Sequence, residues 1–197
     1  MALPQQKQPF DAAAYLAWEA GQAERNEYVA GEVFAMVGVR QSHNVATLNL
    51  AMALRSHLKG TSCRVFIESV KTRVEAADCF FYPDIAVTCD TRDRNTPEYI
   101  SHPSLLVEVL SESTAAYDRG KKFAAYRKLE SLQEYLLVDL DSRRLELFRR
   151  NPENHWVLYD YGAGESIELA TLSISIPVDL VFEDTDEPSP NTATDSA

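Results

Sequence analysis

The stretch Leu105–Leu110 reads LLVEVL, a near-continuous apolar run with one carboxylate, Glu108, in its middle. A run of this kind is typical of a β-strand that is covered on both faces of a sheet. A carboxylate in such a strand does not easily reach water, and burying it unpaired costs several kcal/mol or forces its protonation. The stretch therefore predicts a central strand and a neighbouring group that compensates Glu108.

A second apolar strand is predicted at Tyr82–Val87, which reads YPDIAV, with proline at its entry. Asp84 would lie near the end of this strand. Two carboxylates on neighbouring central strands repel each other, so the pKa of one should rise unless a cation lies between them. Carboxylate oxygens suit a hard divalent ion, and Mg²⁺ commonly uses one or two carboxylates together with waters. On spacing alone, metal binding competes with a solvent-facing strand end and with a buried ion pair to an arginine.

Elsewhere helical periodicity alternates with short apolar runs that are bounded by turn residues. Helices are predicted at 11–20, 43–59 and 115–129, with N-caps at Asp11, at Ser42 and at Ser113 or Thr114. Ala30-Gly31 predicts an N-terminal hairpin. Further strands are predicted at 63–74, 134–140, 145–149, 156–161 and 173–176. This order predicts an α/β (α+β) fold: a mixed central sheet flanked by helices, with extra C-terminal strands.

The length of 197 residues fits one domain, which we place at residues 10–182. Residues 1–9 are expected to be a flexible N-terminus, and the polar segment 183–197 a disordered acidic tail. No stretch approaches the roughly 20 apolar residues that cross a bilayer. The N-terminus also lacks the basic and then apolar pattern of a signal peptide.

The three cysteines, Cys63, Cys79 and Cys89, form no CxxC pair and leave one thiol over from any disulfide scheme. Buried, reduced thiols in a cytoplasmic protein are therefore expected. Zinc is disfavoured because neither paired cysteines nor an HExxH motif occurs.

The net charge of −11 works against nucleic-acid binding, because that affinity is dominated by neutralising phosphates. Segment 183–197 carries five carboxylates and no Lys or Arg, so −5 belongs there and −6 to the rest. Either a basic patch near 119–128 contacts the nucleic acid, or the substrate is not ordinary duplex DNA.

Asp118, Lys122 and Tyr126 follow one another at spacings of four, and so share one face of the helix predicted at 115–129. An Asp–Lys pair at this spacing is usually a solvated surface pair worth a few tenths of a kcal/mol. The alternative is that Lys122 points inward and meets Asp84 and Glu108.

Six short motifs occur in order along the chain, each weak alone. They are E-Y-x-x-G-E-V, S-H at a helix start, Y-P-D, V-E-V-L-S-x-S-T, D-R-x-x-K-x-x-x-Y and E-Y-x-x-V-D, found at Glu27–Val33, Ser42-His43, Tyr82–Asp84, Val107–Thr114, Asp118–Tyr126 and Glu134–Asp139. With these motifs the chain resembles, over residues 10–182, the bacterial Uma-two (Uma2) family of restriction endonuclease-like proteins, a branch of the PD-(D/E)XK nuclease superfamily.

This resemblance implies a metal-dependent endonuclease that hydrolyses phosphodiester bonds of nucleic acid, DNA foremost. It implies that Asp84, Glu108 and the backbone carbonyl of Val109 hold Mg²⁺ or Mn²⁺. Nuclease folds of this type often act as dimers, so a homodimer is a further expectation. The alternative is a nuclease fold kept as a non-catalytic binding or regulatory protein, which the acidic charge favours. A serine hydrolase is disfavoured because no G-x-S-x-G elbow surrounds Ser111.

The chain departs from the superfamily motif at the lysine, whose position is held by Leu110. The resemblance implies that Lys122 supplies the ammonium instead, with Lys121 as its competitor. It also implies that Glu27 and His43 line the catalytic site. From position alone, Glu27 is equally a solvated hairpin charge and His43 an ordinary residue at a helix start.

The predicted helix also carries four basic residues that are candidates for phosphate contacts, although such residues are more often simply solvated. These are Arg119, Lys121, Arg127 and Lys128.

Overall fold

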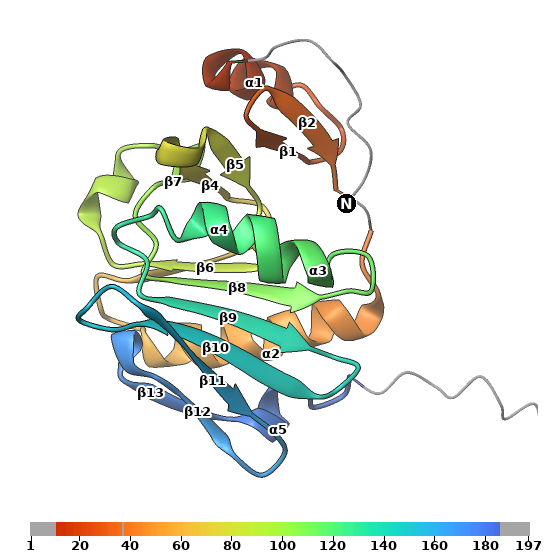
Figure 1. Ribbon diagram of the computed structural model, residues 1–197, viewed down its shortest axis with the longest axis vertical. Coiled ribbons are helices and arrows are strands. Elements are labelled where there is room, and N and C mark those ends of the chain that lie inside the picture. The colour runs from red at the N-terminus through yellow and green to blue at the C-terminus, as the bar shows by residue number, and fades with distance from the viewer. Residues whose placement is uncertain (1–10, 37, 186–197) are drawn as a thin grey trace, which may run out of the picture.

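The computed structural model describes residues 11–36 and 38–185 and contains one six-stranded, one five-stranded and one two-stranded sheet with helices around them (Figure 1). The predicted fold class, a mixed α/β architecture with sheets flanked by helices, is confirmed. The larger two sheets meet near the middle of the molecule. Residues 1–10 and 186–197 lie outside the described residues, so the predictions of a flexible N-terminus at 1–9 and of a disordered tail stay predictions there. The first three residues of the tail predicted at 183–197 are described: Thr185 is buried, and the Glu183 carbonyl accepts from Asn49 Nδ2 at 2.8 Å.

The six-stranded sheet has the order β11-β10-β9-β8-β6-β3. Its strands are β11 (Trp156–Tyr161), β10 (Arg144–Arg150), β9 (Glu134–Asp139), β8 (Leu105–Leu110), β6 (Ile85–Thr88) and β3 (Arg64–Ile67). β8 and β9 are parallel and the other pairs antiparallel, which makes the sheet mixed. All six residues of β8 are buried, so the central strand predicted from LLVEVL is confirmed.

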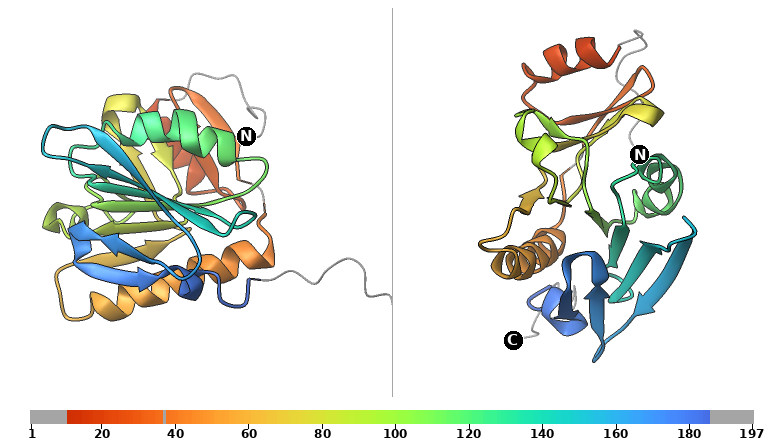
Figure 2. Two further views of the ribbon diagram at one scale, coloured as in Figure 1. Left: turned by 60° about the horizontal axis from the view of Figure 1, so that its bottom comes forward. Right: turned by 90° about the vertical axis from the view of Figure 1, so that its left-hand side faces the viewer.

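Helices cover both faces of this sheet (Figure 2). α2 (Gln41–His57) packs on one face against Val107 and its neighbours at alternate positions. The other face carries α3 (Ala115–Tyr117), the π-helical turn η3 (Asp118–Lys122) and α4 (Phe123–Tyr126). Leu106 and Leu110 pack in that second layer. Side chains of a strand alternate between faces, so Glu108 points toward η3 and α4 rather than toward α2.

The five-stranded sheet has the order β2-β1-β5-β4-β7 and is covered by α1 (Ala12–Glu19). Its strands are β2 (Glu32–Ala35), β1 (Asn26–Val29), β5 (Cys79–Phe81), β4 (Lys71–Val74) and β7 (Tyr99–Ile100). The predicted hairpin is present: Ala30 and Gly31 adopt φ of 47° and 94° between β1 and β2, as a two-residue hairpin turn requires. Asp11 caps α1 as predicted, since its Oδ1 accepts from the Ala14 N–H at 2.7 Å.

Two predicted strands differ from the strands of the structure, one by division between two sheets and one by a later start. The strand predicted at 63–74 breaks at Glu68, whose φ is 45°, and becomes β3 of one sheet and β4 of the other. The strand predicted at Tyr82–Val87 begins only at Ile85, because β5 ends at Phe81 and the chain crosses between sheets here. Asp84 therefore lies in a short link between β5 and β6.

Helix boundaries also differ from the prediction. α2 begins at Gln41 after Arg40, which makes no side-chain capping bond, and Ser42 is buried in the first turn instead of capping it. The helix predicted at 115–129 ends at Tyr126 and contains the π-helical turn.

Smaller elements complete the chain. They are β12 (Ser166–Leu169), which was not predicted, β13 (Ile174–Pro177), α5 (Val178–Val181), and the 3-10 turns η1 (Glu75–Ala77), η2 (Thr91–Arg94) and η4 (Ala170–Leu172). None of the helices within 11–36 and 38–185 has the length and apolar character needed to cross a membrane.

The expectation of three reduced thiols is wrong. Cys63 and Cys89 form a disulfide, and Cys79 is free and buried. The bond forms because these two residues flank Arg64 and Thr88, which are partners in the β3–β6 pairing. The thiol argument for a cytoplasmic location therefore no longer holds.

Candidate active site

The five residues expected at the site come from five different segments and line one cleft of about 1240 Å³. Glu27 lies on β1, His43 on α2, Asp84 in the β5–β6 link, Glu108 on β8 and Lys122 in η3. The cleft lies where the two large sheets meet. Its position explains why a link between sheets and the end of a central strand contribute side chains together.

Lys122 lies at the centre of a buried cluster of carboxylates. Its Nζ is 2.9 Å from Glu108 Oε1, 3.0 Å from Glu27 Oε1 and 3.9 Å from Asp118 Oδ1. Lys122 is only 5% exposed, so it points inward as the resemblance implied, whereas Lys121 is exposed. Geometry therefore separates the two competing lysines.

Glu27 is held in place from the opposite side. Its Oε1 accepts a hydrogen bond from the Tyr82 backbone N–H at 3.1 Å. The link that carries Asp84 is thereby tied to β1. Glu27 is buried rather than a solvated hairpin charge.

Asp84 forms the second half of the site. Its Oδ2 accepts from the Val109 N–H at 2.6 Å and lies 3.3 Å from His43 Nε2. The backbone of Val109 is thus beside Asp84 at the end of β8. Oδ1 takes part in neither contact.

The pKa shifts of the cluster reflect burial first and the neighbouring charges second. Burial raises the pKa of Glu108 well above its ordinary value; Lys122 opposes this, and nearby carboxylates add to it. Burial likewise raises the pKa of Asp118, against the effect of Lys122. Burial alone would lower the pKa of Lys122, but the surrounding carboxylates raise it well above its ordinary value. One ammonium therefore does not neutralise the cluster.

His43 is buried and lies beside Asp84. Burial alone would lower its pKa, but the Asp84 carboxylate raises it above the ordinary value, with smaller contributions from Glu68 and the Val109 backbone. His43 Nδ1 is buried and has no hydrogen-bond partner in the described part of the chain. An orphaned buried nitrogen in a cleft is a position where a water or ligand atom would be satisfied.

These residues fit a divalent cation. Glu27, Asp84, Glu108 and Asp118 bring four carboxylates against one lysine, and burying such charge is costly unless a cation pairs it. Within 11–36 and 38–185, no three His, Cys, Asp or Glu side chains form a ready-made cage. Such a cage is not required, because Mg²⁺ is usually bound by one or two carboxylates and several waters.

The basic residues expected to contact phosphates are mostly engaged elsewhere. Arg119 Nη2 is 2.6 Å from Glu146 Oε1 and 2.9 Å from Asp139 Oδ2. Lys128 Nζ donates to the Ala76 carbonyl, and the Arg127 guanidinium lies over the Phe123 ring. Lys121 alone of the four has no side-chain hydrogen bond, ion pair or ring contact among the described residues.

Sequence reasoning assigned no role to two members of the cluster, Asp118 and Tyr126. Asp118 is 3% exposed and lines the cleft, and the Tyr126 hydroxyl donates to Glu108 Oε1 at 2.9 Å. Their common helical face with Lys122 was the available signal. The surface-pair interpretation of that face is wrong, because all three side chains are buried.

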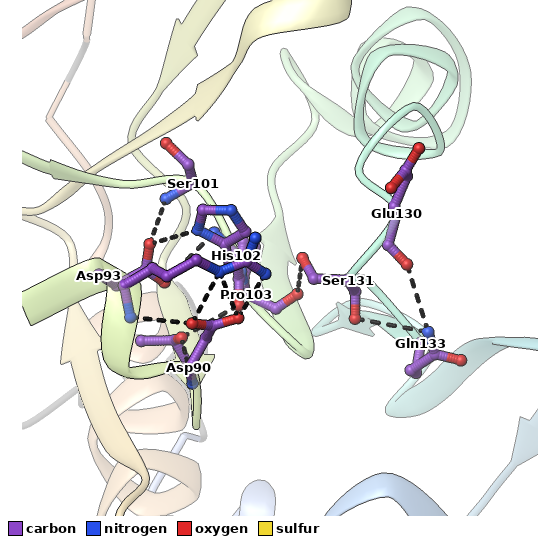
Figure 3. A network of polar contacts seen from close by, with 10 residues as sticks. Asp90, Asp93, Ser101, His102, Pro103, Glu130, Ser131 and Gln133 are labelled. Atoms are coloured by element: carbon purple, nitrogen blue, oxygen red, sulfur yellow. Dashed lines mark hydrogen bonds and ion pairs between the residues drawn. The ribbon is translucent and has the colours of Figure 1, made fainter.

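A second polar network lies at the other end of β8 (Figure 3). Asp93 accepts from the Ser101 and His102 backbone N–H groups, and its Oδ1 is 2.9 Å from His102 Nδ1. Ser131 Oγ donates to the Pro103 carbonyl. These bonds fix the loop that leads into β8, away from the cleft, which Asp93 and His102 do not line.

A mixed sheet with a carboxylate on its central strand, a second carboxylate at the entry of the neighbouring strand and a buried lysine defines a restriction-endonuclease-like fold. A family model, Uma2, described as "Putative restriction endonuclease", matches residues 12–179. The chain belongs to this family.

Two relatives and one solved structure are similar to this chain. The "Uncharacterized protein slr1290" of Synechocystis sp. is 38% identical over 85% of this chain and 88% of that protein. The "Uncharacterized protein sll1609" of the same organism is 31% identical over 83% and 94%. A crystal structure titled as a "putative nuclease belonging to DUF820" from Anabaena variabilis has a TM-score of 0.72 at 17% identity, covering 88% of this chain and 98% of that one. This last likeness shows the fold.

Proposed function

We propose that this chain is a metal-dependent endonuclease, which hydrolyses phosphodiester bonds of nucleic acid, DNA foremost, with Mg²⁺ or Mn²⁺. The observation that carries the proposal is the cluster of three carboxylates, Glu27, Glu108 and Asp118, around the buried Lys122, in an open cleft that Asp84 also lines. Replacing a buried ion pair with apolar residues of similar size is often neutral or stabilising, so stability alone does not account for the cluster. A functional role does account for it, because the carboxylates can bind a cation and the lysine can bind a phosphate.

Asp84, Glu108 and the Val109 carbonyl would hold the ion. When bound there, the ion supplies polarisation of the scissile phosphate and a water of lowered pKa. Asp84 Oδ1 and Glu108 Oε2 are the oxygens that take part in none of the contacts given above, and so they are the atoms proposed to face it.

Lys122 would stabilise the negative charge that develops on the phosphate. Its ammonium is already charged, because the carboxylates around it raise its pKa. Glu27 holds this ammonium from the far side of the cleft, at 3.0 Å. His43 would fix Asp84 through Nε2 and orient a water or phosphate oxygen through its unpartnered Nδ1.

The acidic balance of the chain favours the alternative, a nuclease fold that binds without cutting. A buried carboxylate on β8 and a buried lysine favour catalysis, because a binding surface has no physical need for either. The same acidity predicts that nucleic-acid binding depends strongly on the divalent ion.

We also propose a homodimer in which β11 pairs with β11 of a second copy. β11 is an edge strand of the six-stranded sheet, and Val157, Leu158 and Tyr159 are 38%, 51% and 40% exposed on it. Exposed apolar edge strands are templates for pairing with another chain. Asp160 is the only charged residue of β11, so antiparallel pairing of two copies brings no like charges directly opposite near the strand centre. A monomer in light scattering across a concentration series would refute this.

The decisive experiment is cleavage of plasmid and single-stranded DNA with Mg²⁺ or Mn²⁺, by the wild type and by Asp84→Asn, Lys122→Met and Glu112→Gln. Glu112 is an exposed acid on the rim of the same cleft, outside the cluster, and is the matched control. We expect metal-dependent cutting that the first two substitutions abolish and the third preserves. Cutting that survives Asp84→Asn would contradict the proposed site, and binding without cutting would favour the non-catalytic alternative.

A further inference from the structure

Tyr126 is a buried residue in contact with the proposed metal ligand Glu108, and its role is not yet explained. Its hydroxyl donates to Glu108 Oε1 at 2.9 Å, and the side chain is fully buried. This is the hydroxyl's one hydrogen bond among the described residues. A buried hydroxyl that donates its hydrogen bond to one carboxylate oxygen fixes the orientation of that carboxylate.

The Tyr126 ring itself cannot move freely. Phe81 contacts it edge-on with ring centroids 5.1 Å apart, and Tyr135 contacts it edge-on at 5.5 Å. Such contacts hold an aromatic ring in a defined position within a closely packed core. Packing of the ring in the core, and not a contact in the cleft, therefore determines the position of the hydroxyl.

Glu108 Oε1 has a second donor, the Lys122 ammonium, also at 2.9 Å. That ammonium is shared with Glu27 at 3.0 Å, and the proposed function requires it to turn toward a phosphate. Once Lys122 engages a phosphate, its bond to Glu108 weakens. The bond from Tyr126 does not depend on the substrate.

We infer that Tyr126 is the positioning residue of the metal site, holding Glu108 by Oε1 so that Oε2 is presented toward Asp84 whether or not Lys122 is engaged. This inference rests on the proposed function. Hydrogen-bond partners that orient metal-binding carboxylates typically change metal affinity or activity about 10–100-fold when they are removed. The role is thus distinct from the packing role of a buried ring.

The test is Mn²⁺ affinity, measured on the full chain without nucleic acid by the electron paramagnetic resonance signal of free Mn²⁺. Tyr126→Phe keeps the ring and removes only the hydroxyl. Tyr135→Phe is the matched control, because it removes a hydroxyl from the neighbouring buried ring, where the partner is the Asp118 carbonyl at 3.1 Å. We expect Tyr126→Phe to weaken Mn²⁺ binding about 10-fold and Tyr135→Phe to change it less than about 2-fold.

Equal affinities for the wild type, Tyr126→Phe and Tyr135→Phe would overturn the inference while leaving the proposed metal site intact. A wild type that binds no Mn²⁺, and is indistinguishable from Asp84→Asn, would overturn both. If Tyr126→Phe does not fold, Phe81→Leu replaces it, because it loosens one side of the ring contact and keeps the hydroxyl. A weakening of about 2–5-fold is then expected for Phe81→Leu, and an unchanged affinity would refute the inference.

Discussion

Replacing Lys122 with Met removes the single ammonium from a cluster of carboxylates while keeping the length of the side chain. Glu108 and Glu27, at 2.9 and 3.0 Å from its Nζ, are then left buried without a cation. Removing one partner of a buried ion pair typically costs about 3–5 kcal/mol. For a chain of this size each kcal/mol lowers Tm by roughly 2–4 °C, so we expect a fall of about 6–20 °C.

The assay is thermal unfolding followed by circular dichroism, in EDTA and again with millimolar Mg²⁺. Lys121→Met is the matched control, because its side chain is exposed on the same turn; it should change stability by less than about 0.5 kcal/mol. Mg²⁺ should recover part of the loss in Lys122→Met, since a ligand of the native state stabilises it by mass action. Equal Tm values for the two variants in EDTA would show that Lys122 does not pair the buried charge.

Two further predictions concern stability. Because the folded-state pKa of Glu108 lies above its ordinary value of 4.5, its stabilising protonation is complete below that pH and is lost as the pH rises through the folded-state pKa. In EDTA, Glu108→Gln should therefore gain stability relative to the wild type as the pH rises above 4.5, and parallel pH curves would contradict this. Reducing the Cys63–Cys89 disulfide, whose sequence separation is 26, should lower the free energy of unfolding by about 3.5 kcal/mol. Thiol titration of the denatured chain should find one free thiol before reduction and three after, and three before reduction would refute the bond.

The central strand was predictable because its signal is local. Six residues of LLVEVL contain enough apolar surface to require cover on both faces, whatever the rest of the chain does. The hairpin at Ala30-Gly31 was predictable for the same reason, since its turn depends on the two residues that adopt positive φ. Glu108 stood out because a charge in such a strand conflicts with its surroundings.

The division of the strand predicted at 63–74 between two sheets could not be found in the same way. Phe66, Val70 and Val74 carry a strand-like pattern, but Glu68 bends the chain out of one sheet and into another. Which sheet a short strand joins depends on distant pairing partners. The disulfide has the same origin, because the β3–β6 pairing brings its two cysteines together.

The sequence by itself determined the fold class, the buried carboxylate of the central strand, and the likeness of six motifs to one family. Only the tertiary structure decided that Lys122 and not Lys121 is buried, that Glu27 pairs with that lysine, and that the Tyr126 hydroxyl donates to Glu108. The physical reason is that apolar pattern and turn chemistry act between neighbours in the chain. Burial, ion pairing and pKa depend on groups that the fold brings together from distant segments.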